Sequence, residues 1–267
     1  MTDLNTIRDD LVAQQESLDE IVAAITDDQW RLATPSPGWS VADQIGHLTF
    51  FDATAAVAII DTEAFRTSVE ELMAGALEVG MDDYTLGDTR AMSSVEVLDS
   101  WREAREALRE AALTLEEDDR VEWYGPSMGA RSFLTARLME TWAHGTDVAD
   151  ALGTHLEATD RLRHIAQLGF ITRNWSYVVR GEEPPPETVR LELQGPSGQI
   201  WTWGPDDADD VVRGSAEDFC LVVTQRRHVD DTSLEAGASA MHWLLRAQAF
   251  AGEPTNGPAP RGIDASR

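Results

Sequence analysis

Residues 132–153 read SFLTARLMETWAHGTDVADALG, and this stretch decides both the fold and the candidate site. Ser132 is a residue type that begins helices, and Gly153 is a type that ends them. Glu140 and His144 are four positions apart, which places both side chains on one helical face, one turn from each other. An amphipathic helix is predicted here because apolar residues recur at helical spacing: Phe133, Leu134, Leu138, Trp142 and Val148.

The same periodicity predicts three further long helices in the first 155 residues. One of them begins with Ser40-Val-Ala-Asp43, a capping-box-like start in which Asp replaces the usual Glu or Gln. Between two of these helices, residues 62–92 predict a short helix followed by a loop at MDDYTLGDTRAM. The segment VEWYGPSMGARS, residues 121–132, is also predicted as a loop. The three additional long helices are predicted over 4–26, 40–60 and 93–115.

The pattern changes in the second half of the chain. A helix is predicted over 159–179, and GEEPPPET then marks a boundary because it holds three prolines. VRLELQG and QIWTWG alternate with a period of two and predict a β-hairpin. A short third strand and two helices are predicted over 206–214, 215–227 and 233–252. The predicted organisation is therefore a mainly α protein, with an up-down four-helix bundle over 1–155, a linking helix plus an α+β domain over 156–253, and a flexible tail over 254–267.

Composition restricts the classes of function. The 267 residues carry a net charge of −27, and all 21 basic residues are arginine. So negative a chain argues against nucleic acid and anionic membranes as partners. The N-terminus has no basic and apolar segments of the kind found in signal peptides, and the single Cys220 fits a reducing compartment. The sequence therefore predicts a cytoplasmic protein, with Cys220 as a small buried hydrophobic residue and not a nucleophile.

Three residues predict a metal site when they are taken together. Glu140 and His144 share one helical face, and His47 lies beside the apolar stripe of an earlier helix in the same bundle. Taken alone, His47 is more often a satisfied, partly buried histidine, and an isolated Glu–His pair at this spacing is common on helix surfaces. Two histidines and a carboxylate with an open fourth position are typical of a catalytic metal site. Zinc suits these ligands, and nickel or iron would also accept them.

These residues carry a resemblance to a known family. PSPGWSVADQIGHL, which contains His47, and the later ETWAHGTDVADAL resemble the DinB-like metal-binding bundle, and more narrowly the mycothiol-dependent maleylpyruvate isomerase family. The resemblance covers nearly the whole chain, including the C-terminal α+β domain. It implies that His47, Glu140 and His144 hold a single metal ion. It also implies that a low-molecular-weight thiol, mycothiol, takes the open position and becomes a thiolate.

The activity that this resemblance implies is isomerisation of a conjugated double bond, or S-transfer, on a small electrophile. The family uses an arginine of the C-terminal domain near a substrate carboxylate, and Arg213, Arg226 and Arg227 are the candidates here. For each of the three, solvation at the surface is the alternative. The segment 62–92 and an extended C-terminal helix depart from the simplest family pattern, so maleylpyruvate itself is not assigned as the substrate.

Two other functions stay open from the sequence: a metal-binding protein of this fold that senses or binds a small molecule, and a thiol-independent metal hydrolase. A monomer and a homodimer are equally compatible with the sequence. Three acidic residues lie close to the proposed ligands. Asp147 and Asp150 are expected to be solvated positions, with orientation of a ligand imidazole as the alternative, and Asp52 is similarly open.

Overall fold

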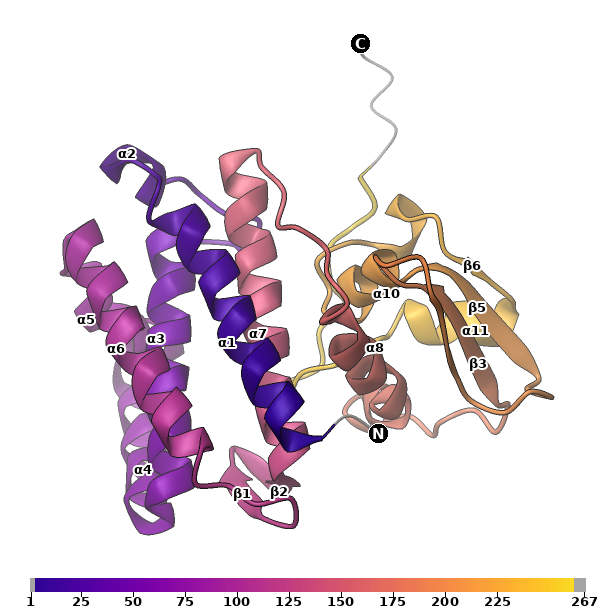
Figure 1. The fold of residues 1–267 in the computed structure, drawn as a ribbon, viewed down its shortest axis with the longest axis horizontal. Coiled ribbons are helices and arrows are strands. Elements are labelled where there is room, and N and C mark those ends of the chain that lie inside the picture. Colours follow the sequence, from indigo (N-terminus) through magenta and orange to yellow (C-terminus); the bar gives the residue numbers. More distant parts are fainter. Residues whose placement is uncertain (1–2, 262–267) are drawn as a thin grey trace. The chain divides into compact units, whose positions relative to one another are not determined.

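A computed structural model describes residues 3–261, and its contacts divide the chain into two units, Met1–Leu156 and Glu157–Arg267. Among the described residues, the first unit is a four-helix bundle with three additional helices and a short β-hairpin, and the second is a small α+β unit. Figure 1 shows the four long helices of the first unit side by side. They are α1 (Leu4–Val22), α3 (Val41–Ile60), α6 (Ser94–Ala112) and α7 (Ala130–Leu152). The predicted mainly α fold class is confirmed.

Local sequence explains where the bundle helices begin. Ser40 and Asp43 form the predicted capping box at the start of α3, and Ser93 forms another with Glu96 at the start of α6. The Asp3 side chain accepts a hydrogen bond from the Thr6 backbone N–H at the start of α1. The helices then bury one apolar face each, in a core that includes Leu18, Val22, Trp30, Val41, Ile45, Leu48, Val97, Trp101 and Val148.

The first helix was predicted over residues 4–26, which is longer than the helix in the structure. Helix α1 ends at Val22, and a separate short helix, α2 (Asp27–Trp30), follows with Thr26 as its capping residue. Trp30, the last residue of α2, is buried in the bundle core.

The prediction for residues 62–92 was wrong in its second part. Helix α4 (Thr62–Val79) is followed by helix α5 (Met81–Arg90) where a loop was expected. Gly80, with φ 96°, makes the sharp connection between them. Helix α5 exists because it packs: Leu86 is buried, and the ring of Tyr84 lies so close to Gly75 of α4 that a Cβ there would clash with it. Tertiary contacts thus override a composition that is unfavourable for a helix.

The prediction of a loop over residues 121–132 was also wrong. An antiparallel hairpin forms here from β1 (Arg120–Trp123) and β2 (Gly125–Gly129), and α7 begins directly after it at Ala130. Ser132 therefore lies inside α7 and is not its capping residue. At the other end, Gly153 adopts the left-handed conformation predicted for a helix end.

The second unit has a four-stranded sheet in the order β4-β3-β5-β6. The predicted hairpin is present, since β3 and β4 pair antiparallel, while β5 pairs parallel to β3. Alternate residues of β3 are buried, as a period of two requires. The strands are β3 (Val189–Gln194), β4 (Ile200–Trp203), β5 (Asp210–Ser215) and β6 (Glu235–Ala236).

The helices of this unit are shorter than predicted. The helix predicted over 159–179 is broken at Thr172, the next ends at Val223, and the last begins only at Ala238, after a strand and a 3-10 turn. Leu191 and Phe219 are among the fully buried residues of this unit. The helices are α8 (Leu162–Ile171), α9 (Arg173–Val178), α10 (Ala216–Val223) and α11 (Ala238–Leu244), with the turn η1 at Val229–Asp231.

Thr255 and Arg261, in the first part of the predicted flexible tail, form hydrogen bonds with earlier residues of the second unit. The Thr255 hydroxyl bonds to Gln225, and the Arg261 backbone N–H bonds to Asp231. Residues 262–267 of that predicted tail lie outside the described residues. None of the helices in the described part of the chain has the length and apolar character needed to cross a membrane.

Candidate metal centre

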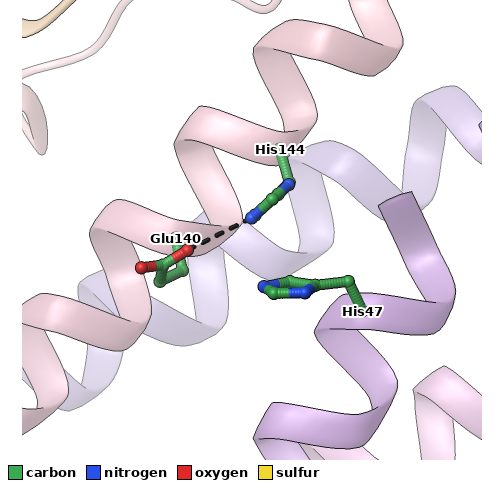
Figure 2. A group of neighbouring side chains, drawn as sticks. All are labelled: His47, Glu140 and His144. Carbon is green, nitrogen blue, oxygen red and sulfur yellow. Dashed lines mark hydrogen bonds and ion pairs between the residues drawn. The ribbon is translucent and has the colours of Figure 1, made fainter. Parts of the chain in front are cut away.

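Helices α3 and α7 bring the three predicted ligands together. His47 lies in the second turn of α3, and Glu140 and His144 are one turn apart in the middle of α7. Figure 2 shows the His47 side chain pointing from α3 toward the pair on α7. The capping box of Ser40 and Asp43 fixes where α3 begins, and thereby the position of His47 along that helix.

The geometry of these side chains fits a single small cation. One ligand atom from each of His47, Glu140 and His144 lies within 4.8 Å of the other two, and His144 Nε2 is 3.2 Å from Glu140 Oε2. Tetrahedral zinc with bonds of about 2.0–2.1 Å places its ligand atoms about 3.3 Å apart. The His144–Glu140 pair already has this separation, and the ligand atoms of the whole set, which lie within 4.8 Å of one another, would have to move closer to bind a metal ion. His144 is buried, and the other two side chains are half-buried.

The electrostatics of the site keep Glu140 ionised. Burial alone would raise the pKa of its carboxyl group. The hydrogen bond with His144 and the charges of His144, Arg137 and His47 outweigh that effect and lower the pKa to about 2. When the two imidazoles are neutral instead, they and the carboxylate each offer a lone pair, and a divalent cation then takes the place of the protons.

A loop residue, Trp39, lies against both imidazole rings. Its ring centroid is 5.1 Å from that of His47 and 5.9 Å from that of His144. Its indole N–H donates a hydrogen bond of 2.9 Å to Asp82 of α5. The segment 62–92, whose role was open in the sequence, thus supports a residue that covers the candidate ligands.

Aromatic side chains also lie on another side of His47. The Phe51 ring, one turn further along α3, is 4.6 Å from the His47 ring, and Tyr124 is 5.8 Å from Phe51. Burial raises the pKa of Tyr124 to about 12, so its phenol is neutral near pH 7. The surroundings of the candidate ligands are therefore partly apolar, which strengthens charge interactions within the site.

The structure corrects the expectation for Asp147 and places Asp52, which the sequence left open. Asp147 is 2% exposed rather than solvated, and it accepts a hydrogen bond from Ser36 Oγ. Asp52 is completely buried, and Arg137 of α7 donates to it at 2.7 Å. Asp150, by contrast, is half-buried. Sequence reasoning missed Arg137 because a pair between two helices becomes visible only when their register is known.

The remaining candidates lie in the second unit. Cys220 is fully buried, as predicted, and burial raises the pKa of its thiol, which opposes any role as a nucleophile. Arg213 is paired with Glu192 at 2.8 Å. Arg226 and Arg227 each donate to a backbone carbonyl, those of Thr224 and Arg226. Recognition of a substrate carboxylate by any of the three arginines stays a prediction.

The fold and the clustered side chains define the class of the molecule: a helical bundle with a candidate single-metal centre, joined to an α+β unit. The sequence profile of the mycothiol maleylpyruvate isomerase N-terminal domain matches residues 11–149, which is more than half of the chain and includes all three proposed ligands. The chain belongs to this family. A second profile, wyosine base formation, matches residues 185–236 in the α+β unit.

Comparisons with whole proteins extend the similarity over both units. Two uncharacterized proteins of Mycobacterium tuberculosis, MT0041 of strain CDC 1551 / Oshkosh and Rv0036c of strain H37Rv, are each 47% identical over 251 residues. The alignments cover 93% of this chain and 96% of each relative.

Solved structures share the fold at much lower identity. The crystal structure of the mycothiol-dependent maleylpyruvate isomerase has a TM-score of 0.59 at 15% identity, and that of a mutant has 0.58 at 14%. Each comparison covers 95% of this chain and 97% of the other. The shared fold therefore includes residues of both units of this chain.

Proposed function

We propose that this protein is a metal- and mycothiol-dependent enzyme, an isomerase or S-transferase that acts on a small electrophile. The observation that carries the proposal is the convergence of His47, Glu140 and His144 from two helices, with ligand atoms within 4.8 Å of one another. Membership of the family supports the thiol, and the fold shared with a mycothiol-dependent isomerase supports the reaction class.

His47, Glu140 and His144 would hold one divalent cation, with zinc favoured and nickel or iron also accepted. When it is bound, this metal supplies one effect: it lowers the pKa of a thiol at its open position, so that a thiolate forms near neutral pH. Glu140 contributes the single negative charge among the three ligands. Trp39 and Phe51 pack against the imidazole rings and exclude water from those faces.

The substrate class follows from the side chains near these ligands. The rings of Phe51 and Tyr124 favour a flat, conjugated body over a purely polar one, because aromatic faces pack well against planar groups. A carboxylate on such a molecule would be recognised by one of the candidates Arg213, Arg226 and Arg227, since a guanidinium binds carboxylates with two parallel hydrogen bonds.

Thiol dependence tests this proposal. Protein reconstituted with Co²⁺ should develop a sulfur-to-metal charge-transfer band when mycothiol is added, and His144→Ala should not. The band should persist in Cys220→Ala, because that thiol is buried away from solvent. A reaction of a conjugated electrophile that requires both metal and mycothiol would complete the assignment.

The alternatives give different results in the same experiment. A spectrum that mycothiol leaves unchanged, together with metal-dependent hydrolysis of an ester or amide, would favour a thiol-independent hydrolase. An unchanged spectrum with metal bound and no turnover would favour a sensing or binding protein. Either result would overturn the thiol-dependent proposal while leaving the metal site in place.

A further inference from the structure

Gln44 connects the candidate metal centre to the loop before α3. It is completely buried, one turn before His47 on the same helix. Its Oε1 is in hydrogen-bond contact with His144 Nδ1. Its Nε2 donates to the Thr34 hydroxyl at 2.8 Å, and that hydroxyl donates to the Trp39 carbonyl oxygen at 2.9 Å. One continuous chain of hydrogen bonds thus runs from a backbone carbonyl to a candidate metal ligand.

The direction of every hydrogen bond in this chain follows from its first member. A carbonyl oxygen only accepts, so the single proton of the Thr34 hydroxyl points to Trp39. Toward Gln44 that hydroxyl must therefore accept, which turns the NH₂ end of the Gln44 amide to Thr34. The carbonyl end of the amide then faces His144, and Nδ1 of His144 must carry a hydrogen to donate to it.

The geometry points to Gln44 as a positioning residue that keeps a hydrogen on Nδ1 of His144 and so assigns Nε2 to the metal. Nε2 is the nitrogen that faces Glu140, at 3.2 Å. The inference rests on the proposed metal site, because it names the residue that prepares one ligand of that site. A histidine ligand generally donates its other ring N–H to a fixed acceptor, and loss of that acceptor typically weakens metal binding about 10–100-fold.

The loop gives this arrangement its rigidity. The Thr34 backbone N–H also donates to the Trp39 carbonyl at 2.8 Å, and residues 33 and 40 form an isolated bridge, so the acceptor of the chain is held at a fixed place. Trp39 itself lies against the His144 ring. Thr34 of this loop therefore sets the direction of the hydrogen bonds that lead through Gln44 to His144. The indole of Trp39, also in the loop, restricts the plane of the His144 ring.

Metal affinity of matched variants provides the first test. Gln44→Leu, which keeps the size but removes the acceptor, should weaken zinc binding about 10–100-fold. Gln44→Glu restores an acceptor for Nδ1 and should bind zinc clearly more tightly than Gln44→Leu, since the acceptor of the Nδ1 hydrogen is what matters. Gln15→Leu is the control: Gln15 is also buried in the bundle but bonds to Asp52, so its loss should leave zinc affinity unchanged. Wild-type affinity in Gln44→Leu would overturn the inference.

The protonated ring nitrogen of His144 can be observed directly by ¹⁵N NMR, without metal. At a pH where the ring is neutral, the wild type should show the hydrogen on Nδ1, where Gln44 accepts it. In Gln44→Leu the hydrogen should move to Nε2, because the Glu140 carboxylate is then the remaining acceptor. A hydrogen on Nε2 in the neutral wild-type ring would overturn the inference. This readout is independent of metal binding, so a protein that binds no zinc but keeps the Nδ1 hydrogen would contradict the proposed function and not the role of Gln44.

Discussion

Helices α3 and α7 meet through polar side chains at two places that are built differently. At one place Asp52 of α3 accepts two hydrogen bonds from Arg137 of α7, at 3.0 and 2.7 Å, and a third from Gln15. At the other, His47 of α3 faces Glu140 and His144 of α7. The first place contains one full positive and one full negative charge, so the two side chains neutralise each other and need no bound ion. The second is a set of lone-pair donors, which a cation would complete.

Burial of polar groups between α3 and α7 is expected to serve two purposes: folding stability at the Asp52–Arg137 pair and, under the proposed function, metal binding at the ligand cluster. The Asp52–Arg137 pair is completely enclosed and balances its own charge, which is the condition for keeping ions inside a protein. The ligand cluster is partly exposed, and a ring from a loop covers it. A structural pair should therefore control folding, while the cluster should control metal binding and affect folding less.

The largest expected effect breaks the structural pair. Asp52→Ala leaves the Arg137 guanidinium buried without a countercharge and should lower the free energy of unfolding by about 3–5 kcal/mol. Urea unfolding followed by circular dichroism measures this loss. The double variant Asp52→Leu/Arg137→Met removes both charges and should recover most of the stability, since apolar replacements of a buried pair are often neutral. A loss below about 1 kcal/mol in Asp52→Ala would show that the pair is not structural.

A smaller effect separates the ligand cluster from the pair. Zinc at 100 times its Kd should raise the free energy of unfolding of the wild type by about 2.7 kcal/mol, because it binds the folded state. Glu140→Gln keeps the shape but loses the charged ligand, so zinc should stabilise this variant far less. Without metal, the same variant should lose the stabilisation that the lowered pKa of Glu140 represents at pH 7, but less than Asp52→Ala loses, so the effect of zinc is measured against each protein's own metal-free stability. Equal stabilisation of both proteins by zinc would contradict the proposed role of Glu140.

The smallest effect concerns a pair that is only partly enclosed. Asp19 of α1 bonds to Arg102 and Arg105 of α6 at 2.7 Å each, and the hydrogen bond from Arg102 is the main cause that lowers the pKa of its carboxyl group. Because the pKa is lower in the folded state, this stabilisation is present above the ordinary value of about 3.9 and is lost as pH falls through the folded-state pKa.

Asp19→Asn should therefore destabilise the protein by about 1 kcal/mol at pH 7, and the difference from wild type should shrink below about pH 4. Urea unfolding at a series of pH values measures it. A difference that stays constant down to pH 2.5 would assign the effect of the substitution to packing instead of charge.

The long bundle helices and the proposed ligands could be predicted from the sequence because their signals are local. The spacing of Glu140 and His144 needs only helical geometry, and the start of α3 at Ser40 needs only a capping box. His47 could be predicted as the third ligand because the helices of a bundle face one another.

The features that the sequence did not predict depend on tertiary contacts. Helix α5 forms because its residues pack against α3 and α4, as Thr89 does against Gly46. No local sequence pattern predicts that contact. The Asp52–Arg137 pair and the contact of Gln44 with His144 join residues 85 and 100 positions apart. The sequence allows many pairings among its Asp, Arg and Gln residues, and only the relative register of α3 and α7 determines that these two contacts form.

Metal content is the measurement that tests the central claim most directly. Plasma mass spectrometry on untagged wild type and on His47→Ala, Glu140→Ala and His144→Ala should find about one equivalent of zinc, nickel or iron in the wild type, as a single three-ligand site requires. All three variants should lose it, while Gln15→Leu should keep it. Metal at wild-type stoichiometry in the three variants, or none in the wild type after reconstitution, would contradict the metal centre.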